Sequence, residues 1–96
     1  MKNKEVFYQT VAAIPAGSYT TYGELAKLCG VHVRQIMAWL KQMPKDSNLP
    51  WHRIINGQRR ISDHPKKQQQ HELLLLEGLV PDNKNKYSKE WLWPKY

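Results

Sequence analysis

The segment Leu49-Pro50-Trp51-His52-Arg53 contains the side chains that come closest, in type and order, to those of a reactive site. A histidine can act as general base for an adjacent nucleophile, and a proline-fixed turn would hold such a pair in place. Trp51 offers no nucleophile, because an indole forms no acyl or phosphoryl intermediate and is not alkylated under mild conditions. It does offer a broad apolar face for stacking and one N–H donor. The segment therefore indicates either a stacking surface or a tryptophan that fills the core.

The composition predicts one small basic domain that spans residues 1–96. A chain of 96 residues with 41% hydrophobic content is long enough for one core and leaves no room for a second domain. Lys and Arg number 15 against 8 Asp and Glu, so the formal net charge is +7, spread along the chain. An anionic partner is expected, with nucleic acid favoured over a membrane because no helix combines a strongly basic face with a wide aromatic one. The alternative is that the charge only provides solubility.

Cysteine usage and apolar runs indicate where the protein resides. The only cysteine, Cys29, excludes an internal disulfide and a multi-cysteine metal site, and its place beside Leu25 and Leu28 predicts a buried thiol in a reducing cytoplasm. The polar N-terminus lacks the apolar run of a signal peptide, and the longest apolar run, residues 73–76, is too short to span a bilayer. We expect a soluble, unprocessed, cytoplasmic protein with no membrane contact.

The first half of the chain predicts three helices. Apolar residues spaced three and four apart predict a helix over residues 4–14 that Pro15-Ala16-Gly17 ends, and Tyr19 and Thr20 favour a short strand. A capping box from Thr21 to Glu24 opens a second helix, which runs to Cys29 and stops at Gly30. A third helix over residues 31–43 follows, and Pro44 ends it. The predicted inner stripe of this helix is Val33, Ile36, Met37 and Leu40, and the predicted outer face is Arg34, Ala38 and Lys41.

Two short helices joined at a glycine, the second with a cationic outer face of small residues, are typical of a helix-turn-helix. The second half predicts a polar loop at residues 45–48, a strand at Ile54-Ile55, a turn at Asn56-Gly57 and a return strand at residues 59–61, which together would form a small wing. The fold class expected is therefore mostly α, a winged helix with a helix-turn-helix and a small β wing. A last helix capped by Asp63 or His64, with Pro65 in its first turn, would end at Gly78, and the aromatic tail, residues 84–96, would fold back.

Four runs carry a family resemblance: IPAGSYTTYGELAKLCG, VRQIMAWL, LPWHRIIN and LLLLEG. In this order they resemble the C-terminal domain of the O6-alkylguanine-DNA alkyltransferases, over nearly the whole chain. That family reads Pro-Cys-His-Arg, and its Cys takes the alkyl group from guanine. Trp51 in place of the Cys is similar to the alkyltransferase-like proteins, which bind the damaged base without repairing it.

The resemblance implies a non-enzymatic protein that binds double-stranded DNA containing O6-alkylguanine. The helix-turn-helix would contact the minor groove, the lesion would flip into a pocket beside Trp51, and nucleotide excision repair proteins would be recruited. No catalytic residue, metal or cofactor is implied, and a monomer suits a reader of single lesions.

Individual roles carry over by position. Tyr22 matches the tyrosine that presses on the phosphate beside the target nucleotide, and Arg34 matches the arginine that occupies the hole left by the flipped base. His64 lies near the position of a residue that stacks over the lesion. The resemblance and the outer face together give a predicted lesion pocket of Trp51, His64 and Tyr22, and a predicted DNA-binding set of Arg34, Tyr22, Ala38, Lys41 and Gln35.

His52 and Glu77 match a relay to the absent cysteine, so their implied role is structural, with Glu77 bonding to His52. For Arg53 an ion pair or a backbone bond is expected rather than a DNA contact. Met37 stands where the family commonly has Gly, so it must turn inward if the helix is to approach the groove closely. Met43 stands where the alkyltransferases have Asn, and the segment between Gly30 and Arg34 is about two residues shorter than usual.

Two other functions stay open at this point. One is a true alkyltransferase that uses Cys29, although no cation adjacent in sequence would lower the pKa of its thiol. The other is a transcriptional regulator that reads sequence through the third helix, with Gln35 and Gln42 as base-reading side chains.

Overall fold

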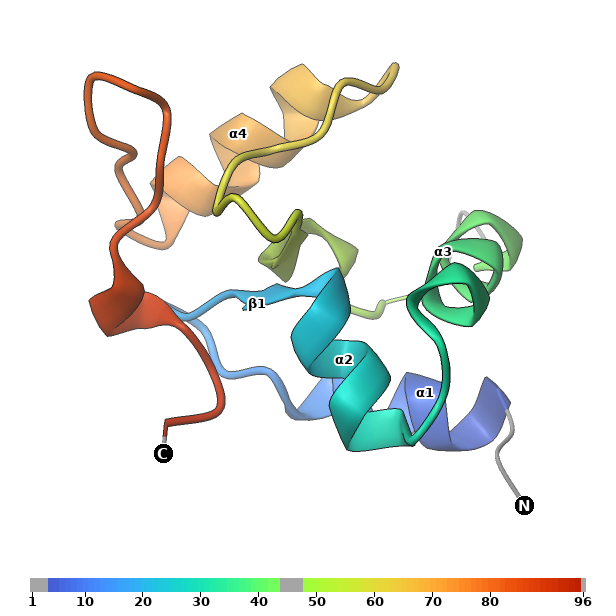
Figure 1. Ribbon diagram of the computed structural model, residues 1–96. Coiled ribbons are helices and arrows are strands. Elements are labelled where there is room, and N and C mark those ends of the chain that lie inside the picture. Colours follow the sequence, from blue (N-terminus) through green and yellow to red (C-terminus); the bar gives the residue numbers. More distant parts are fainter. Residues whose placement is uncertain (1–3, 44–47, 96) are drawn as a thin grey trace.

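The computed structural model describes residues 4–43 and 48–95, which form four α-helices, a two-stranded sheet and two 3-10 helices (Figure 1). Some predictions fall on residues outside this description. They concern Pro44, which was predicted to end the third helix, residues 45–47 of the predicted loop, and Tyr96 of the tail. The mostly α fold with a small sheet is confirmed. The elements are, in chain order, α1 (Lys4–Ala13), β1 (Thr20–Thr21), α2 (Tyr22–Cys29), α3 (Val33–Gln42), η1 (Trp51–Arg53), β2 (Ile54–Ile55), α4 (Lys67–Leu76) and η2 (Lys89–Trp91).

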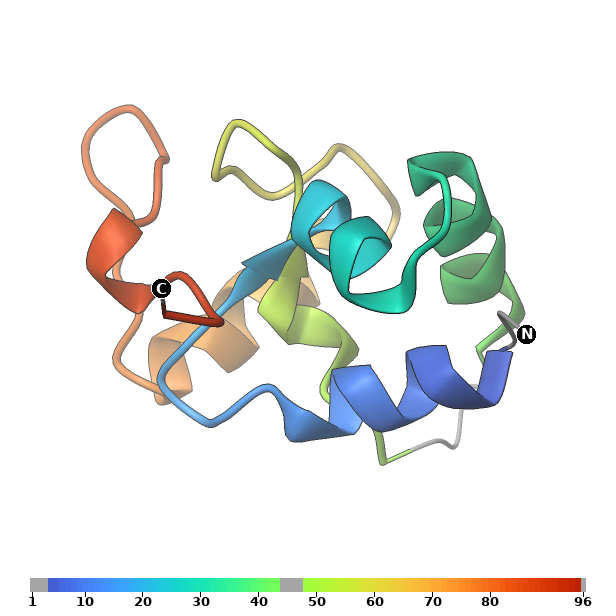
Figure 2. The ribbon, with the colours of Figure 1, turned by 60° about the horizontal axis from the view of Figure 1, so that its bottom comes forward.

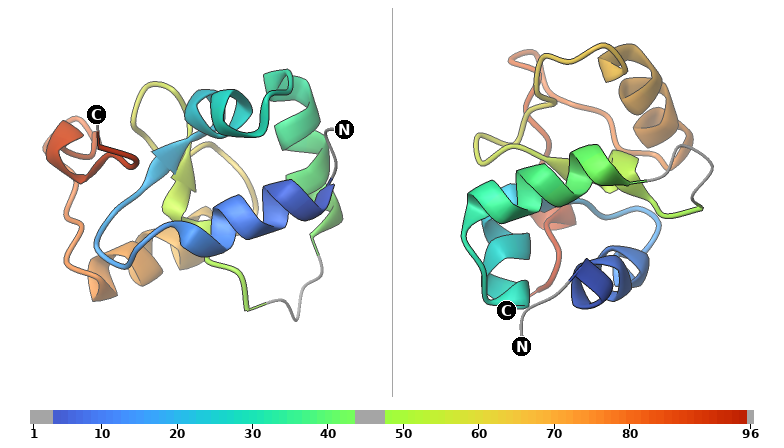
Figure 3. Two further views of the ribbon diagram at one scale, coloured as in Figure 1. Left: turned by 90° about the horizontal axis from the view of Figure 1, so that it is seen from below. Right: turned by 90° about the vertical axis from the view of Figure 1, so that its right-hand side faces the viewer.

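The sheet joins two buried apolar clusters. Helices α1, α2 and α3 gather at one end of the molecule, and α4 and the C-terminal segment lie at the other (Figures 1 and 3). Ile54 packs into the cluster of α1, α2 and α3, whereas Ile55 packs with Leu74 of α4 and Tyr87 of the C-terminal segment. Successive side chains of a strand point to opposite faces, so the two residues of β2 pack into different clusters.

Local signals place α2 and α3 where the sequence predicts them. The Thr21 hydroxyl accepts a hydrogen bond from the Glu24 N–H at 3.2 Å, which is the Thr half of the predicted capping box. Gly30 ends α2 at a φ of 68°, a conformation that glycine reaches without steric penalty. α3 starts shortly afterwards, and His32 caps it by accepting the Arg34 N–H at 3.1 Å.

The inner face of α3 differs from the predicted stripe. Ile36 and Trp39 are buried, with exposed fractions of 0% and 8%, but Val33 and Met37 are 36% and 37% exposed. The prediction that Met37 turns inward is therefore wrong. Trp39 packs on Phe7 of α1 with ring centroids 5.5 Å apart, and this large aromatic side chain sets which side of the helix faces the core.

The strand predicted at Ile54-Ile55 is present as β2, but its partner is not the return strand of the predicted wing. β1 and β2 pair in parallel, with Thr20 opposite Ile54, and residues 59–61 form no strand. Asn56 instead closes a turn, because its N–H donates to the Arg60 carbonyl and its Oδ1 accepts the Arg60 N–H, both at 3.1 Å. A side chain that bonds to nearby backbone in this way competes with a strand ladder, so the expected hairpin is a loop.

α4 begins later than the sequence suggested. Neither Asp63 nor His64 caps it, and its first residue is Lys67, so Pro65 precedes the helix instead of occupying its first turn. The Lys67 N–H donates to the His64 carbonyl at 3.1 Å, and this turn contains the proline. The Asp63 carboxylate pairs with the Lys67 ammonium at 2.8 Å rather than with a free helix N–H.

The C-terminal segment folds back onto the domain, as predicted (Figure 2). Tyr87 is buried against Tyr19, with ring centroids 6.0 Å apart. The Tyr19 N–H donates to the Trp91 carbonyl at 2.9 Å, and the Trp93 N–H donates to the Tyr19 carbonyl at 2.8 Å. α4 ends before Gly78, the predicted stop, which has a left-handed φ of 84°.

Candidate functional site

A cavity of about 400 Å³ opens between α3, η1 and the segment that precedes α4. We call it the Trp51 cavity. Trp51, His64 and Tyr22, which the sequence assigned to one pocket, all line it. The other lining residues are Met37, Leu40, Lys41, Met43, Ile54, Ser62, Asp63, Lys66 and Gln70.

Trp51 is half-buried and forms a flat wall of this cavity. Its indole meets His64 edge-on, with ring centroids 6.5 Å apart at 75°, and the Lys66 ammonium lies 6.0 Å from the ring centroid. A cation at this distance is attracted to the electron-rich face of the ring. The cavity therefore presents an apolar ring face with a positive charge next to it.

A tight turn holds Trp51 in this position. The Trp51 N–H donates to the Leu49 carbonyl at 2.8 Å, and the Arg53 N–H donates to the Pro50 carbonyl at 3.0 Å. Pro50 contributes a fixed φ to this turn. Ile54, the first residue of β2, is buried in the core directly after η1. The strand thus fixes one end of the turn.

Behind the indole, Glu77 is the centre of a polar network. Its Oε2 lies 2.7 Å from the His52 Nε2, and the Arg53 Nε and Nη2 groups donate to it at 3.0 and 2.8 Å. Its Oε1 accepts the Gly17 N–H at 3.0 Å, and the Arg53 Nη1 donates to the Ile14 carbonyl at 2.8 Å. The ion pair and the backbone bond expected of Arg53 are both present.

This network changes the acidity of Glu77. Burial raises the pKa of its carboxyl, but hydrogen bonds from Arg53, His52 and the Gly17 N–H outweigh burial and lower the pKa from 4.5 to about 2. Four donor groups thus bond to this one carboxylate. It ties η1 to the end of α1 and to the end of α4.

Gln70 is a residue of the site that sequence reasoning did not identify. It is 3% exposed, and its amide nitrogen donates to the carbonyls of His52 and Ile54 at 3.1 and 2.9 Å. Its Oε1 lies 2.8 Å from the His64 Nε2, so one side chain links both edges of the cavity. The sequence signal was weak: Gln70 is four residues before Leu74, on the buried side of α4.

Tyr22 and Ser62 close another edge of the cavity. The Tyr22 hydroxyl lies 3.1 Å from the Ser62 Oγ, which connects the start of α2 to the segment before α4. Tyr22 is half-buried and packs against the core of α1, α2 and α3. Ser62, like Gln70, was not among the predicted site residues.

The predicted DNA-binding side chains of α3 lie beside the cavity. Arg34, Gln35 and Lys41 are exposed, Ala38 is half-buried, and Lys41 also lines the cavity. The right panel of Figure 3 looks onto α3, which crosses the front of the molecule. Within residues 4–43 and 48–95 no side chain forms an ion pair with Arg34. Its guanidinium is thus available to an external anion or base.

Cys29 lies away from this site. It is 5% exposed within the core cluster of α1, α2 and α3, so the predicted buried thiol is confirmed. Burial raises the pKa of the thiol and outweighs the hydrogen bond with the Thr10 hydroxyl, whose oxygen lies 3.9 Å from the Cys29 Sγ. A neutral, buried thiol is a poor nucleophile.

No cluster of three or more His, Cys, Asp or Glu residues suited to a metal ion occurs in the part of the chain that the structure describes. The helices of that part are also too short or too polar for a membrane crossing.

Comparison with known proteins places these features in a family. The family described as 6-O-methylguanine DNA methyltransferase, DNA binding domain, matches residues 2–79. The chain is 47% identical over 76 residues to a DNA base-flipping protein of Escherichia coli (strain K12), which covers 76% of this chain and 59% of the relative. It is 39% identical over 57 residues to Alkyltransferase-like protein 1 of Schizosaccharomyces pombe, which covers 57% of this chain and 53% of the relative.

The structural comparison covers more of the chain. The crystal structure of S. pombe Atl1 in complex with damaged DNA containing O6-carboxymethylguanine superimposes with a TM-score of 0.82 at 29% identity, over 96% of this chain and 94% of that one. The sequence relatives, by contrast, are matched over little more than half of their length. On the family match over residues 2–79, this chain belongs to the family of the 6-O-methylguanine DNA methyltransferase DNA-binding domain.

Proposed function

We propose that this protein recognises O6-alkylguanine in double-stranded DNA, flips the damaged base into the Trp51 cavity and leaves the alkyl group in place. α3 would lie in the minor groove, and Arg34 would fill the space that the flipped nucleotide leaves. The observation that carries this proposal is the position of the cavity directly beside the exposed cationic side chains of α3.

The names of the relatives support this proposal. The E. coli relative is called a DNA base-flipping protein, and the S. pombe structure contains DNA with O6-carboxymethylguanine. The second of these shares 29% identity with this chain over almost its whole length. The same architecture in this chain therefore supports the same class of ligand.

The chemistry of the cavity fits a flipped base that carries an alkyl group. Stacking of a base on an aromatic side chain contributes about 1–3 kcal/mol, and Trp51 offers such a surface. Each methylene of the alkyl group that becomes buried adds about 0.8 kcal/mol to the binding free energy. The exposed Met37 and the half-buried Leu40 and Met43 provide apolar walls for this group. The outward position of Met37, unexpected from the sequence, thus brings a flexible thioether to the lesion side of α3.

The absence of alkyl transfer follows from the residues at the site. By its resemblance to the family, Trp51 would stand at the position of the cysteine, and an indole does not accept an alkyl group under mild conditions. The thiol of Cys29 is buried elsewhere in the core. His52 and Glu77 would then serve to hold η1 in place, since Glu77 is bonded to His52, Arg53 and Gly17 together.

A protein that binds a lesion without removing it needs a further protein to complete repair. We therefore propose that the bound monomer marks the lesion for nucleotide excision repair. Base flipping itself costs a few kcal/mol, which stacking, the insertion of Arg34 and phosphate contacts from side chains such as Lys41 would offset.

A pair of duplexes tests the proposal. One carries O6-methylguanine and the other is the identical undamaged sequence, and fluorescence titration gives the two affinities at one salt concentration. We expect tighter binding to the damaged duplex, with the methyl group still present when the recovered DNA is analysed by mass spectrometry. Equal affinities would refute lesion recognition and favour a sequence-reading regulator, and loss of the methyl group would refute a non-enzymatic role.

A further inference from the structure

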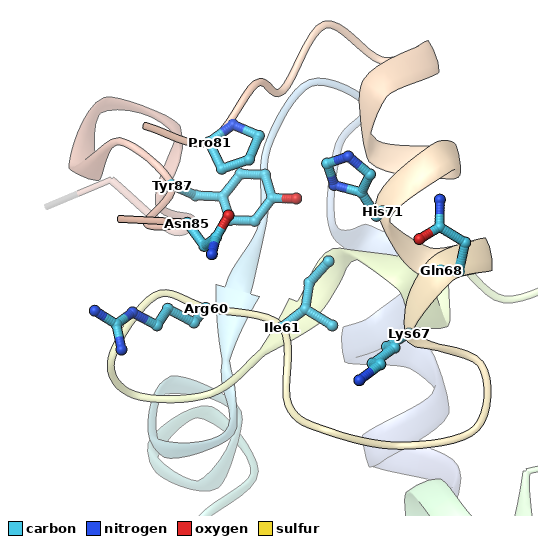
Figure 4. Close-up of a pocket in the computed structure, with 8 residues that line it drawn as sticks. All are labelled: Arg60, Ile61, Lys67, Gln68, His71, Pro81, Asn85 and Tyr87. Carbon is cyan, nitrogen blue, oxygen red and sulfur yellow. The ribbon is translucent and has the colours of Figure 1, made fainter. Parts of the chain in front are cut away.

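A second cavity, of about 440 Å³, lies between α4, the loop at residue 60 and the C-terminal segment (Figure 4). We call it the Tyr87 cavity. It shares no lining residue with the Trp51 cavity. The proposed DNA-binding function uses none of its side chains.

Two buried hydrogen-bond donors of this cavity have no partner. Tyr87 is 1% exposed, and its hydroxyl forms no hydrogen bond within the described part of the chain. Figure 4 shows that this hydroxyl points across the cavity towards His71 of α4. The Nε of Arg60 is likewise buried and unpaired. Buried polar groups are nearly always hydrogen-bonded, so these donors indicate a ligand that brings acceptor oxygens.

The charge of the cavity agrees with such a ligand. Arg60 and Lys67 stand at its opposite ends (Figure 4), and none of its lining residues is acidic. Lys67 does pair with Asp63, but this pair is exposed, with side-chain exposed fractions of 60% and 90%. Exposed pairs contribute little in water, so a second carboxylate can share the ammonium.

Three exposed apolar side chains, which we call the apolar patch, lie close in the chain to residues that line the cavity. Leu75, Leu76 and Val80 are 41%, 83% and 60% exposed. Leu75 follows His71 by four residues and so lies one helical turn further on the same side of α4. Val80 directly precedes Pro81, which lines the cavity. Large exposed apolar side chains in one region of the surface are candidates for protein interaction, and these three belong to the end of α4 and the segment that follows it.

We propose that the Tyr87 cavity and this patch bind an acidic segment of a partner protein. Carboxylates of the segment accept hydrogen bonds from the Tyr87 hydroxyl and the Arg60 guanidinium, and its apolar side chains cover Leu76 and Val80. The side-chain amides of Gln68 and Asn85, which also line the cavity, pair with peptide N–H and carbonyl groups. A phosphate group would leave the exposed apolar side chains uncovered, and therefore a peptide with both carboxylates and apolar side chains fits better.

This surface is separate from the proposed lesion site. The two cavities have no lining residue in common, although Ser62 and Lys66 of the Trp51 cavity adjoin Ile61 and Lys67 of the Tyr87 cavity in the chain, and α3 contributes to the Trp51 cavity but not to the Tyr87 cavity. A partner can therefore bind while α3 is occupied by DNA. The proposal does not depend on lesion recognition, and each can fail without the other.

Fluorescence anisotropy with a short fluorescein-labelled peptide of Glu, Leu and Ser tests the proposal on the whole chain. We expect saturable binding, and none by the peptide in which every Glu is Gln. Tyr87→Phe removes one hydroxyl and keeps the buried ring, so it should weaken binding about tenfold, as a charged hydrogen bond predicts. Arg60→Gln should do the same, whereas Lys89→Gln, which removes the same charge from an exposed residue outside the cavity, should not.

Several results would overturn the proposal. These are no binding up to about 1 mM peptide, equal binding of the Gln peptide, and unchanged binding by both cavity variants. Full competition by inorganic phosphate or ADP would assign the cavity to phosphate ligands instead. Duplex binding is measured on the same variants: we expect it to be unchanged, and a large loss would place this cavity in the DNA interface and refute the separate partner site.

Discussion

The lowered pKa of Glu77 predicts how stability depends on pH. The carboxyl titrates at about 2 in the folded protein against 4.5 without its partners. One pH unit of pKa difference corresponds to about 1.4 kcal/mol, so the charged carboxylate contributes about 3 kcal/mol to the free energy of unfolding. The Glu77 side chain is only 15% exposed, and solvent therefore screens this contribution weakly.

The sign follows from the direction of the shift. Because the folded-state pKa is the lower one, the contribution is complete above about pH 5 and is lost as the pH falls from 4.5 towards 2. Glu77→Gln removes the titrating group and leaves the Arg53 guanidinium without a charged partner. We expect this variant to be about 3 kcal/mol less stable near pH 7, and to lose correspondingly less stability as the pH falls to 2.

Urea unfolding over a series of pH values measures both quantities. Asp63→Asn is the matched control, since Asp63 is an exposed carboxylate in a surface pair. If Glu77→Gln kept the pH dependence of the original protein, the network would not hold the carboxylate as described. A ¹³C NMR titration of the original protein gives an independent answer, and a Glu77 carboxyl that titrates near 4.5 would refute the reasoning.

Other side chains give further predictions. Trp51→Ala should weaken binding to an O6-methylguanine duplex by about 1–3 kcal/mol in a fluorescence titration, and should weaken binding to undamaged DNA much less. An equal loss on both duplexes would contradict a stacking role. Arg34→Lys should weaken lesion binding while the salt dependence stays the same, whereas Lys41→Gln, which removes a proposed phosphate contact, should reduce the slope of log K against log salt by about 0.9. Gln70→Leu leaves two carbonyls without their donor and should cost about 2–4 kcal/mol in urea unfolding; a neutral effect would mean that water replaces the amide. Cys29 should react with a thiol reagent only at the rate of unfolding, and fast labelling of the folded protein would contradict its burial.

The sequence was sufficient for features that depend on local interactions. The Thr21 cap and the Gly30 and Gly78 stops each depend on residues within one helical turn, and all appear in the structure. The place of Trp51 in a cavity with His64 followed from the family resemblance, since no local pattern joins residues 51 and 64.

Features that depend on distant contacts were missed. Met37 was assigned to the core by its helical spacing, but the contact of Trp39 with Phe7 decided the orientation of α3. Ile54 was expected to pair with a neighbouring return strand and pairs with Thr20 instead. The bonds of Gln70 to three residues of the site depend on where α4 meets η1, which periodicity does not reveal.

The parallel pairing of β1 and β2 also has a consequence for the kinetics of folding. The paired residues lie about a third of the chain apart, and bringing them together has an entropic cost before any strand contact repays it. η1, which begins with Trp51, precedes β2 directly, and Tyr22 follows β1 directly. Two walls of the Trp51 cavity therefore come together only when this long loop closes. A nascent or partly folded chain with its helices already formed would still lack the assembled cavity, so closure of the loop is the step at which the chain acquires it.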